Sequence, residues 1–225
     1  MSEPKISINK LGEYLDATPV RRRRIVQDQK DPKAFVAARY TEARDEILNY
    51  VATGMKDDDR LIQAATQLRE ADASSEFVRQ DNLASADAIE DFLDVSDVLD
   101  ISGLTADPCD KNLIAMMKIS GVSVSVRPDM VLRDAKSGSV VGALKLHFSK
   151  TNPLSEKSRE YVATALRVYL YQEGYEAVDH GKCLVIDVPT KKLSAAPKAF
   201  KRKMSDIEAA CEEIEARWRK AEEVQ

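Results

Sequence analysis

The chain has little cysteine and glycine, few aromatic residues and no long apolar run. No apolar segment approaches the roughly 20 residues needed to span a bilayer, and residues 1–15 lack the uninterrupted apolar stretch of a secretory signal. We therefore expect a cytoplasmic protein without a membrane partner. The cysteines Cys109, Cys183 and Cys211 are far apart and odd in number, which disfavours a disulfide framework or a zinc site. We expect three reduced thiols with packing or surface roles.

Several common enzyme motifs are also missing. The sequence contains no glycine-rich phosphate loop, no nucleophile elbow and no cluster of zinc-ligand spacing. Its 225 residues are enough for one good core with a helical extension, in one or two domains. These absences narrow the classes of function without choosing one.

The net charge of −4 conceals a strong segregation of charge along the chain. Residues 57–110 carry 15 acidic side chains against 3 arginines, whereas residues 111–204 carry 17 basic side chains against 8 acidic ones. A basic half fits a polyanionic ligand, because focused positive potential raises the local ligand concentration and the association rate. Three roles are open for the acidic half: it forms a solvated helical face, it binds a protein partner, or it covers the basic face.

Helical signals fill the first hundred residues. Thr18-Pro19 and Asp31-Pro32 each place an N-cap residue before a proline, so we expect helices to start there, the second ending near Gly54. Residues 57–70 and 75–99 continue with helical spacing of apolar residues.

The run of four arginines at residues 21–24 fans around a predicted helix. It could contact nucleic acid. The alternative is a solvated helix in which these arginines pair with Asp28, Asp31 or the acidic segment.

The region from residue 121 to 188 reads as a sheet with a covering helix. A break at residues 103–108 is the expected boundary before it. The predicted elements are strands at 122–126, 130–133 and 140–148, a helix at 154–172 and a strand at 183–188. In the third strand, Val140, Gly142, Leu144, Leu146 and Phe148 should share one face, opposite Val141, Ala143, Lys145, His147 and Ser149. An apolar face opposed by Lys145 and His147 indicates a sheet with one functional side.

This order of elements, with Pro128-Asp129 followed by Ala143-Leu144-Lys145, resembles the core of the PD-(D/E)xK phosphodiesterase superfamily of nucleases. The resemblance covers about residues 83–190. It implies an α/β (α+β) fold: an N-terminal helical region, a restriction-endonuclease-like αβββαβ core and a C-terminal helix. It also implies that Asp129 binds Mg²⁺ and that Lys145 orients the attacking water, since hard divalent cations favour carboxylate oxygens and stabilise charge on phosphate.

Ala143 departs from the family pattern, which has an acid at this position. Three replacements are conceivable. The acid could come from the following helix, where Glu160, or less readily Glu156, would complete the metal site with Asp129. It could come from the preceding helix, from Glu90, Asp91 or Asp94. His147 could also supply a ligand or a proton relay.

Basic residues continue beyond the predicted sheet into a linker and a final helix. The linker either contacts phosphate groups or is simply solvated. We expect Ser205-Asp206 to cap a helix whose stripe of Ile207, Cys211, Ile214 and Trp218 packs within the chain, the alternative being a seam between two chains. The predicted regions are 1–75, helical; 76–190, the nuclease-like core; and 191–225, the basic linker and helix. The candidate nucleic-acid-binding residues are Arg127, Lys150, Lys191, Lys192, Lys201, Arg202 and Lys203.

Two functions follow from these patterns. One is a Mg²⁺-dependent nuclease acting on DNA or RNA, with Asp129, Lys145, His147 and Glu160 as catalytic candidates. The other is a catalytically inactive module of the same fold that binds nucleic acid or a protein partner in a larger assembly, for instance in phage-defence or mobile-element machinery. A third reading is an interaction protein whose acidic residues 57–110 bind a basic partner.

Overall fold

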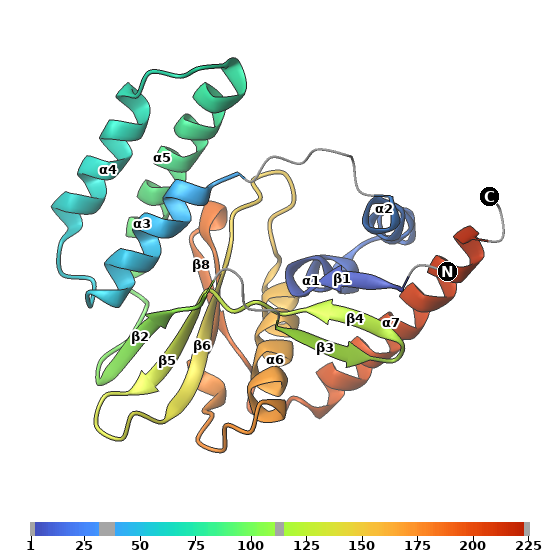
Figure 1. Ribbon diagram of the computed structural model, residues 1–225. Helices are drawn as coiled ribbons and strands as arrows, with labels where there is room; N and C mark the ends of the chain where they lie inside the picture. The colour runs from blue at the N-terminus through green and yellow to red at the C-terminus, as the bar shows by residue number, and fades with distance from the viewer. Residues whose placement is uncertain (1–2, 32–38, 111–114, 223–225) are drawn as a thin grey trace.

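The computed structural model describes residues 3–31, 39–110 and 115–222. These residues form a mixed α/β structure (Figure 1). The N-terminal elements are β1 (Lys5–Ser7), α1 (Ile8–Asp16), α2 (Pro19–Lys30), α3 (Thr41–Ala52), α4 (Asp58–Glu70) and α5 (Glu76–Ser96). The following strands are β2 (Leu104–Pro108), β3 (Met116–Ile119), β4 (Val122–Ser125), β5 (Met130–Asp134) and β6 (Val140–His147). The C-terminal elements are α6 (Glu156–Gln172), β7 (Cys183–Asp187), β8 (Lys192–Ala195) and α7 (Lys201–Glu222), with short 3₁₀ turns at His180–Lys182 and Val188–Thr190.

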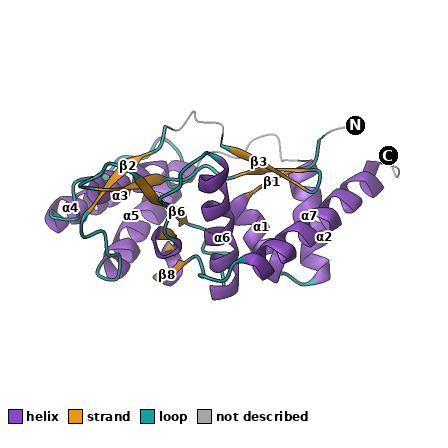
Figure 2. Ribbon diagram, turned by 90° about the horizontal axis from the view of Figure 1, so that it is seen from below, coloured by secondary structure: helices purple, strands orange, loops and turns teal. Residues whose placement is uncertain are grey.

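The strands form two mixed sheets. The larger sheet has the order β2-β5-β6-β7-β8, in which β6 and β7 are parallel and the other neighbours are antiparallel. The smaller sheet has the order β1-β4-β3, with β1 parallel to β4. In Figure 2, the larger sheet and α3–α5 lie on one side of α6, and the smaller sheet with α1, α2 and α7 lies on the other.

Each face of the larger sheet packs into its own hydrophobic core. Leu144 and Leu146 of β6 contact the core formed with α3, α4 and α5. Ala143 and Val185 face the second core, which is shared by α1, α6, α7 and the smaller sheet. The covering helix is confirmed, and so is the predicted alternation from Ala143 to Phe148, because residues two apart in a strand point to the same face. The expectation of one apolar face opposed by a functional face is wrong, since both faces of the sheet are buried.

A β-bulge corrects one detail of that alternation. Leu132 pairs with Gly142, but Arg133 pairs with Val140, so Val141 is an extra residue in β6. Val140 consequently packs in the core with Ala143, on the face opposite Leu144. At Gly142 itself, any Cβ would collide with the Lys182 carbonyl oxygen, so this position requires glycine.

The strand order differs from the predicted one at the edge of the sheet. The segment expected to be a boundary is strand β2, which pairs with β5 along its whole length. The predicted first strand, β4, belongs to the smaller sheet. The polar residues and Pro108 of β2 are not typical of a strand, so the sequence did not indicate one. An edge strand tolerates them because it is hydrogen-bonded to a neighbouring strand on one side only.

Most predicted helices are present. Thr18, Asp57 and Ser75 cap α2, α4 and α5 through their side-chain oxygens. The predicted start at Asp31-Pro32 extends outside the described residues, and α3 begins at Thr41. The final helix packs within the chain as expected, with Ile207, Cys211, Ile214 and Trp218 buried, but it starts at Lys201, before Ser205.

The basic linker was predicted as irregular chain, but residues 192–195 form strand β8, which pairs with β7. β8 needs few apolar residues because, like β2, it lies at the edge of its sheet. Within the part of the chain that the structure describes, no helix combines the length and apolarity needed to cross a membrane.

Candidate functional site

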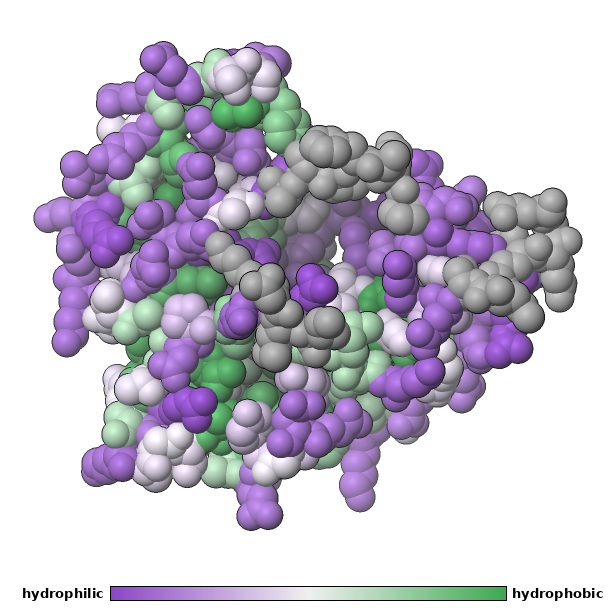
Figure 3. All heavy atoms as spheres, in the orientation of Figure 1, coloured by the Kyte–Doolittle hydropathy of each residue, from purple (hydrophilic) through white to green (hydrophobic). Residues whose placement is uncertain are grey.

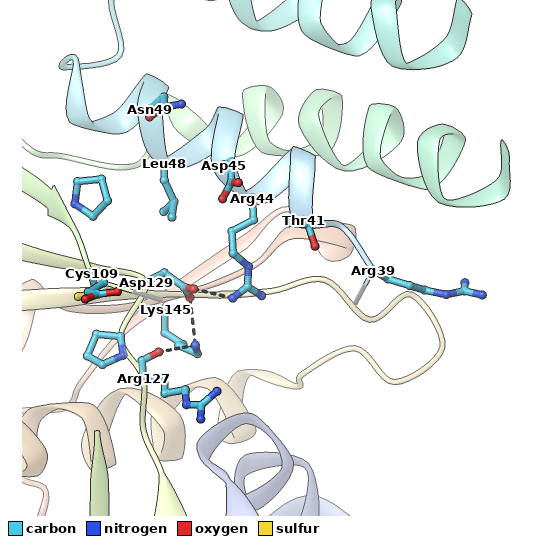
Figure 4. A pocket seen from close by; sticks show the side chains of 13 residues that line it. Arg39, Thr41, Arg44, Asp45, Leu48, Asn49, Cys109, Arg127, Asp129 and Lys145 are labelled. Atoms are coloured by element: carbon cyan, nitrogen blue, oxygen red, sulfur yellow. Dashed lines mark hydrogen bonds and ion pairs between the residues drawn. The ribbon is translucent and has the colours of Figure 1, made fainter. Parts of the chain in front are cut away.

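Asp129 and Lys145 lie side by side over a hollow of about 720 Å³ between α3 and the turn that leads into β5 (Figure 4). Met130 pairs with Leu144, so Asp129 stands next to Lys145 at the start of the β5–β6 ladder. The distance from Lys145 Nζ to Asp129 Oδ2 is 3.2 Å, and the residues are only 7% and 6% exposed. The structure therefore brings together the two residues that the sequence placed on successive strands. We call this cavity the Asp129 hollow; its lining includes Arg39, Arg44, Cys109, Arg127, Asp129 and Lys145.

The backbone around Asp129 holds its side chain in place. Its amide nitrogen donates to the Leu144 carbonyl at 2.9 Å, and its Oδ2 accepts from the Leu146 amide at 2.7 Å. Arg127, two residues earlier, has a left-handed backbone with φ of 40°. In this turn its carbonyl oxygen accepts a hydrogen bond of 2.6 Å from Lys145 Nζ. A left-handed arginine carries backbone strain, which is often found at functional sites.

Arg44 of α3 supplies a second cation to Asp129. Its guanidinium Nη1 donates to Asp129 Oδ1 at 2.8 Å. The two carboxylate oxygens are therefore divided between Arg44 on one side and Lys145 with the Leu146 amide on the other. Arg44 also lies over the Phe148 ring, 5.3 Å from its centroid, which fixes the direction of the guanidinium.

Burial controls the protonation chemistry of this hollow. Desolvation lowers the pKa of Lys145, and the negative charge of Asp129 opposes this by raising it. Burial, reinforced by the charge of Asp129, raises the pKa of the Cys109 thiol to about 11. Cys109 is therefore a neutral thiol at physiological pH and a poor nucleophile.

The residues around Asp129 do not fit a Mg²⁺ centre. Magnesium requires a near-octahedral set of oxygen ligands, yet both oxygens of Asp129 are taken by cationic and amide donors. Ala143 is buried and offers no oxygen, and no group of three potential metal-ligating side chains occurs among the described residues. In this arrangement two cationic side chains, Arg44 and Lys145, pair with the Asp129 carboxylate.

The carboxylates proposed to replace the missing acid lie elsewhere. Glu160 pairs with Lys203 of α7 at 2.7 Å and does not line the Asp129 hollow, so it does not complete a site with Asp129. On α5, Glu90 pairs with Arg69, while Asp91 and Asp94 both pair with Lys191.

His147 bonds to the loop that follows β6. Its Nε2 donates to the Asn152 carbonyl at 2.9 Å, and it lies 4.0 Å from Asp187 Oδ2, beyond hydrogen-bond distance. Desolvation lowers the pKa of His147. These contacts make His147 an anchor of the 149–152 loop.

The predicted nucleic-acid-binding residues do not form one continuous surface. Arg127 is exposed on the Asp129 hollow, and Lys150 lies on a neighbouring hollow, where it pairs with Asp87. Lys191 and Lys192 flank the start of β8. The remaining three are in the first turn of α7, where Arg202 and Lys203 line a separate hollow; they are Lys201, Arg202 and Lys203.

The acidic and basic halves of the sequence meet in space. Asp87, Asp91 and Asp94 of α5 pair with Lys150 and Lys191, at distances of 2.6–3.2 Å. All of these pairs are partly exposed, so each contributes at most about 1 kcal/mol. Within the arginine run, Arg24 pairs with Asp28, whereas Arg21 and Arg22 pair with Glu13 and Glu213.

Sequence reasoning missed Arg39 and Arg44. Arg44 and Asp129 are 85 positions apart, and no spacing rule connects an arginine in an N-terminal helix to a strand turn so far along the chain. The sequence indicated only that Arg44 lies near the beginning of a helix that was expected to pack on the sheet.

No protein-family model matches the chain, and neither a curated protein nor a solved structure matches it. The resemblance to the PD-(D/E)xK superfamily thus remains a prediction from the residues quoted above.

Proposed function

We propose that this chain is a nucleic-acid-binding protein with a nuclease-like sheet, in which an internal ion-pair network takes the place of the metal centre. The observation that carries the proposal is the sharing of the Asp129 carboxylate between Arg44 and Lys145 at the edge of a basic hollow. A carboxylate neutralised in this way no longer repels phosphate. The hollow is lined by four cationic side chains, Arg39, Arg44, Arg127 and Lys145, against the three carboxylates Asp45, Asp110 and Asp129, so a small excess of positive charge faces a ligand.

Two exposed arginines are free to contact phosphate at this hollow. Arg39 and Arg127 are both exposed there, and neither forms an ion pair with an acidic side chain of the described residues. Arg39 lies against the Phe77 ring, 5.1 Å from its centroid, so its guanidinium is oriented without being neutralised. Arginine suits this task because its planar group donates two parallel hydrogen bonds to phosphate oxygens.

Fluorescence anisotropy with labelled DNA and RNA strands tests this function. We expect salt-sensitive binding, and Arg39→Ala and Arg127→Ala should each weaken it about tenfold at low salt, since each removes one charge-assisted phosphate contact. Arg60→Ala is the matched control, because Arg60 is an exposed arginine on α4 that does not line the hollow. Binding that is insensitive to both hollow variants, or no binding at all, would contradict the proposal.

The same preparation separates binding from hydrolysis. We expect no cleavage of DNA or RNA with Mg²⁺ present. Mg²⁺-dependent cleavage that disappears in Asp129→Asn would instead establish the phosphodiesterase alternative, because that substitution keeps the side chain's shape and removes its charge. A protein partner for the acidic residues 57–110 stays a separate prediction.

A further inference from the structure

A second hollow adjoins the Asp129 hollow and shares Arg39 and Arg44 with it. We call it the Tyr40 hollow; it lies between α1, the start of α3 and the end of β6, and has a volume of about 340 Å³. Figure 3 shows a recess in the central part of the molecule, with hydrophilic side chains beside it. The shared arginines make the two hollows one continuous surface with a cationic middle.

The Tyr40 hollow contains an aromatic platform. Tyr40 stacks on Phe148, with ring centroids 5.4 Å apart and ring planes at 17°. Phe148 is buried, whereas Tyr40 is partly exposed. Tyr40 is also the N-cap of α3 and has a left-handed backbone with φ of 60°, an uncommon conformation for an aromatic residue. The buried ring thus supports a second ring that reaches the hollow.

The same hollow contains an unsatisfied hydrogen-bond acceptor. The side-chain nitrogen of Asn9 donates to the Leu146 carbonyl at 3.3 Å, and its buried Oδ1 has no hydrogen-bond partner among the residues that the structure describes. Buried polar atoms are nearly always hydrogen-bonded, so an orphaned acceptor at a cavity points to a ligand that donates. The hydroxyl groups of Ser149 and Thr151 line the cavity as well.

We infer that the Tyr40 hollow binds one unpaired nucleobase, while Arg39 and Arg44 hold the adjoining phosphate. A base offers a flat face to Tyr40 and an N–H group to Asn9 Oδ1. In a duplex these faces and edges are occupied by stacking and pairing, so the ligand is single-stranded nucleic acid. This inference rests on the proposed function and narrows its ligand class.

The contribution of the base can be measured apart from that of the phosphates. The probes are a labelled thymidine strand of about 12 nucleotides, an abasic strand of equal length and charge, and the corresponding duplex. We expect the thymidine strand to bind about fivefold to 150-fold more tightly than the abasic strand, since stacking one base contributes about 1–3 kcal/mol. The duplex should bind no better than the abasic strand.

Variants that keep a large apolar side chain at position 40 test whether a flat ring is needed there. Tyr40→Leu keeps apolar contact with Phe148 but removes the planar face, so it should reduce thymidine binding to the abasic level. Tyr40→Trp should retain tight binding because a flat ring remains. Tyr175→Leu is the matched control, since Tyr175 is an exposed tyrosine that does not line either hollow. Circular dichroism checks that each variant is folded.

The outcomes distinguish the two proposals. Equal affinity of the wild-type protein for thymidine and abasic strands, or an unchanged affinity of Tyr40→Leu for thymidine, would overturn the base pocket and leave polyanion binding at Arg39 and Arg127 intact. Loss of the arginine effects together with all strand binding would overturn the proposed function itself. Tight thymidine binding that depends on a ring at position 40 supports both.

Discussion

Asp129 and Asp187 are two buried aspartates beside the same β-strand, yet their surroundings differ. Asp129 precedes β5, accepts hydrogen bonds from the Arg44 guanidinium and the Leu146 amide, and forms an ion pair with Lys145. Asp187 ends β7 and is completely buried, and within the described residues it accepts hydrogen bonds from neutral donors. These donors are the Leu154 amide at 2.5 Å and the amide and hydroxyl of Thr190 at 3.2 and 2.8 Å.

The difference separates a structural aspartate from a candidate site. Asp187 fixes the chain before α6 and the 3₁₀ turn after β7, which lie next to it in the fold. Asp129 instead joins α3 to the sheet and leaves basic groups around an open hollow. Both carboxylates are buried, so burial does not distinguish them. What distinguishes them is the charge of the groups that they contact and the elements from which those groups come.

The largest expected effect is the loss of stability in Asp129→Ala. This substitution leaves the buried Lys145 ammonium without its counter-charge and the Leu146 amide without an acceptor, so we expect a loss of about 3–5 kcal/mol in the free energy of unfolding. Urea unfolding followed by circular dichroism measures it. Adding Lys145→Met should restore part of this loss, because it removes the uncompensated buried charge.

That double-variant cycle tests whether the pair is coupled. If Asp129→Ala and Lys145→Met destabilise the protein additively, the ion pair contributes no coupling and the network described for Asp129 is wrong. Lys182→Met is the matched control for the second substitution, since Lys182 pairs weakly with Asp100 at the surface. It should not restore stability to Asp129→Ala.

A smaller effect is expected at Asp187. Asp187→Asn keeps one acceptor oxygen but turns an amide N–H₂ toward the Leu154 or Thr190 amide, so the loss should be about 1–3 kcal/mol. Because Asp187 and Lys145 share no hydrogen-bonding partner, Asp187→Asn and Lys145→Met should combine additively to within about 0.5 kcal/mol. If the losses in free energy of unfolding from Asp187→Asn and Lys145→Met are strongly non-additive, Asp187 is coupled to Lys145 and does not differ from Asp129 in this respect.

The meeting of Asp129 and Lys145 was predictable because local rules apply to both. The acid follows a proline at a strand start, the lysine lies on the next strand, and an antiparallel hairpin brings such positions together. The alternation of Leu144, Lys145 and Leu146 likewise follows from strand geometry. Where one residue enters as a bulge, as near Val140, the alternation reverses, and composition gives no warning of it.

The remaining features depend on contacts between distant segments. The strand β2 was hidden because an edge strand need not be apolar, and the direction of Glu160 depends on where α7 packs against α6. Arg44 reaches Asp129 only after α3 has docked on the sheet through Ala43 and Ile47. Helical periodicity predicts which side of α3 is buried, but it does not identify the acid that a flanking arginine will meet.

The smallest expected effect concerns His147, which lies 4.0 Å from Asp187 and lines the Tyr40 hollow. Because burial lowers its pKa in the folded protein, the unfolded chain binds a proton first as the pH falls through about 6.5. The free energy of unfolding should therefore decrease between about pH 7.5 and 5.5, and His147→Gln should reduce this pH dependence. An identical pH dependence in His147→Gln and wild type would mean that the proton uptake occurs elsewhere, and that the charge of Asp187 offsets the burial of the imidazole.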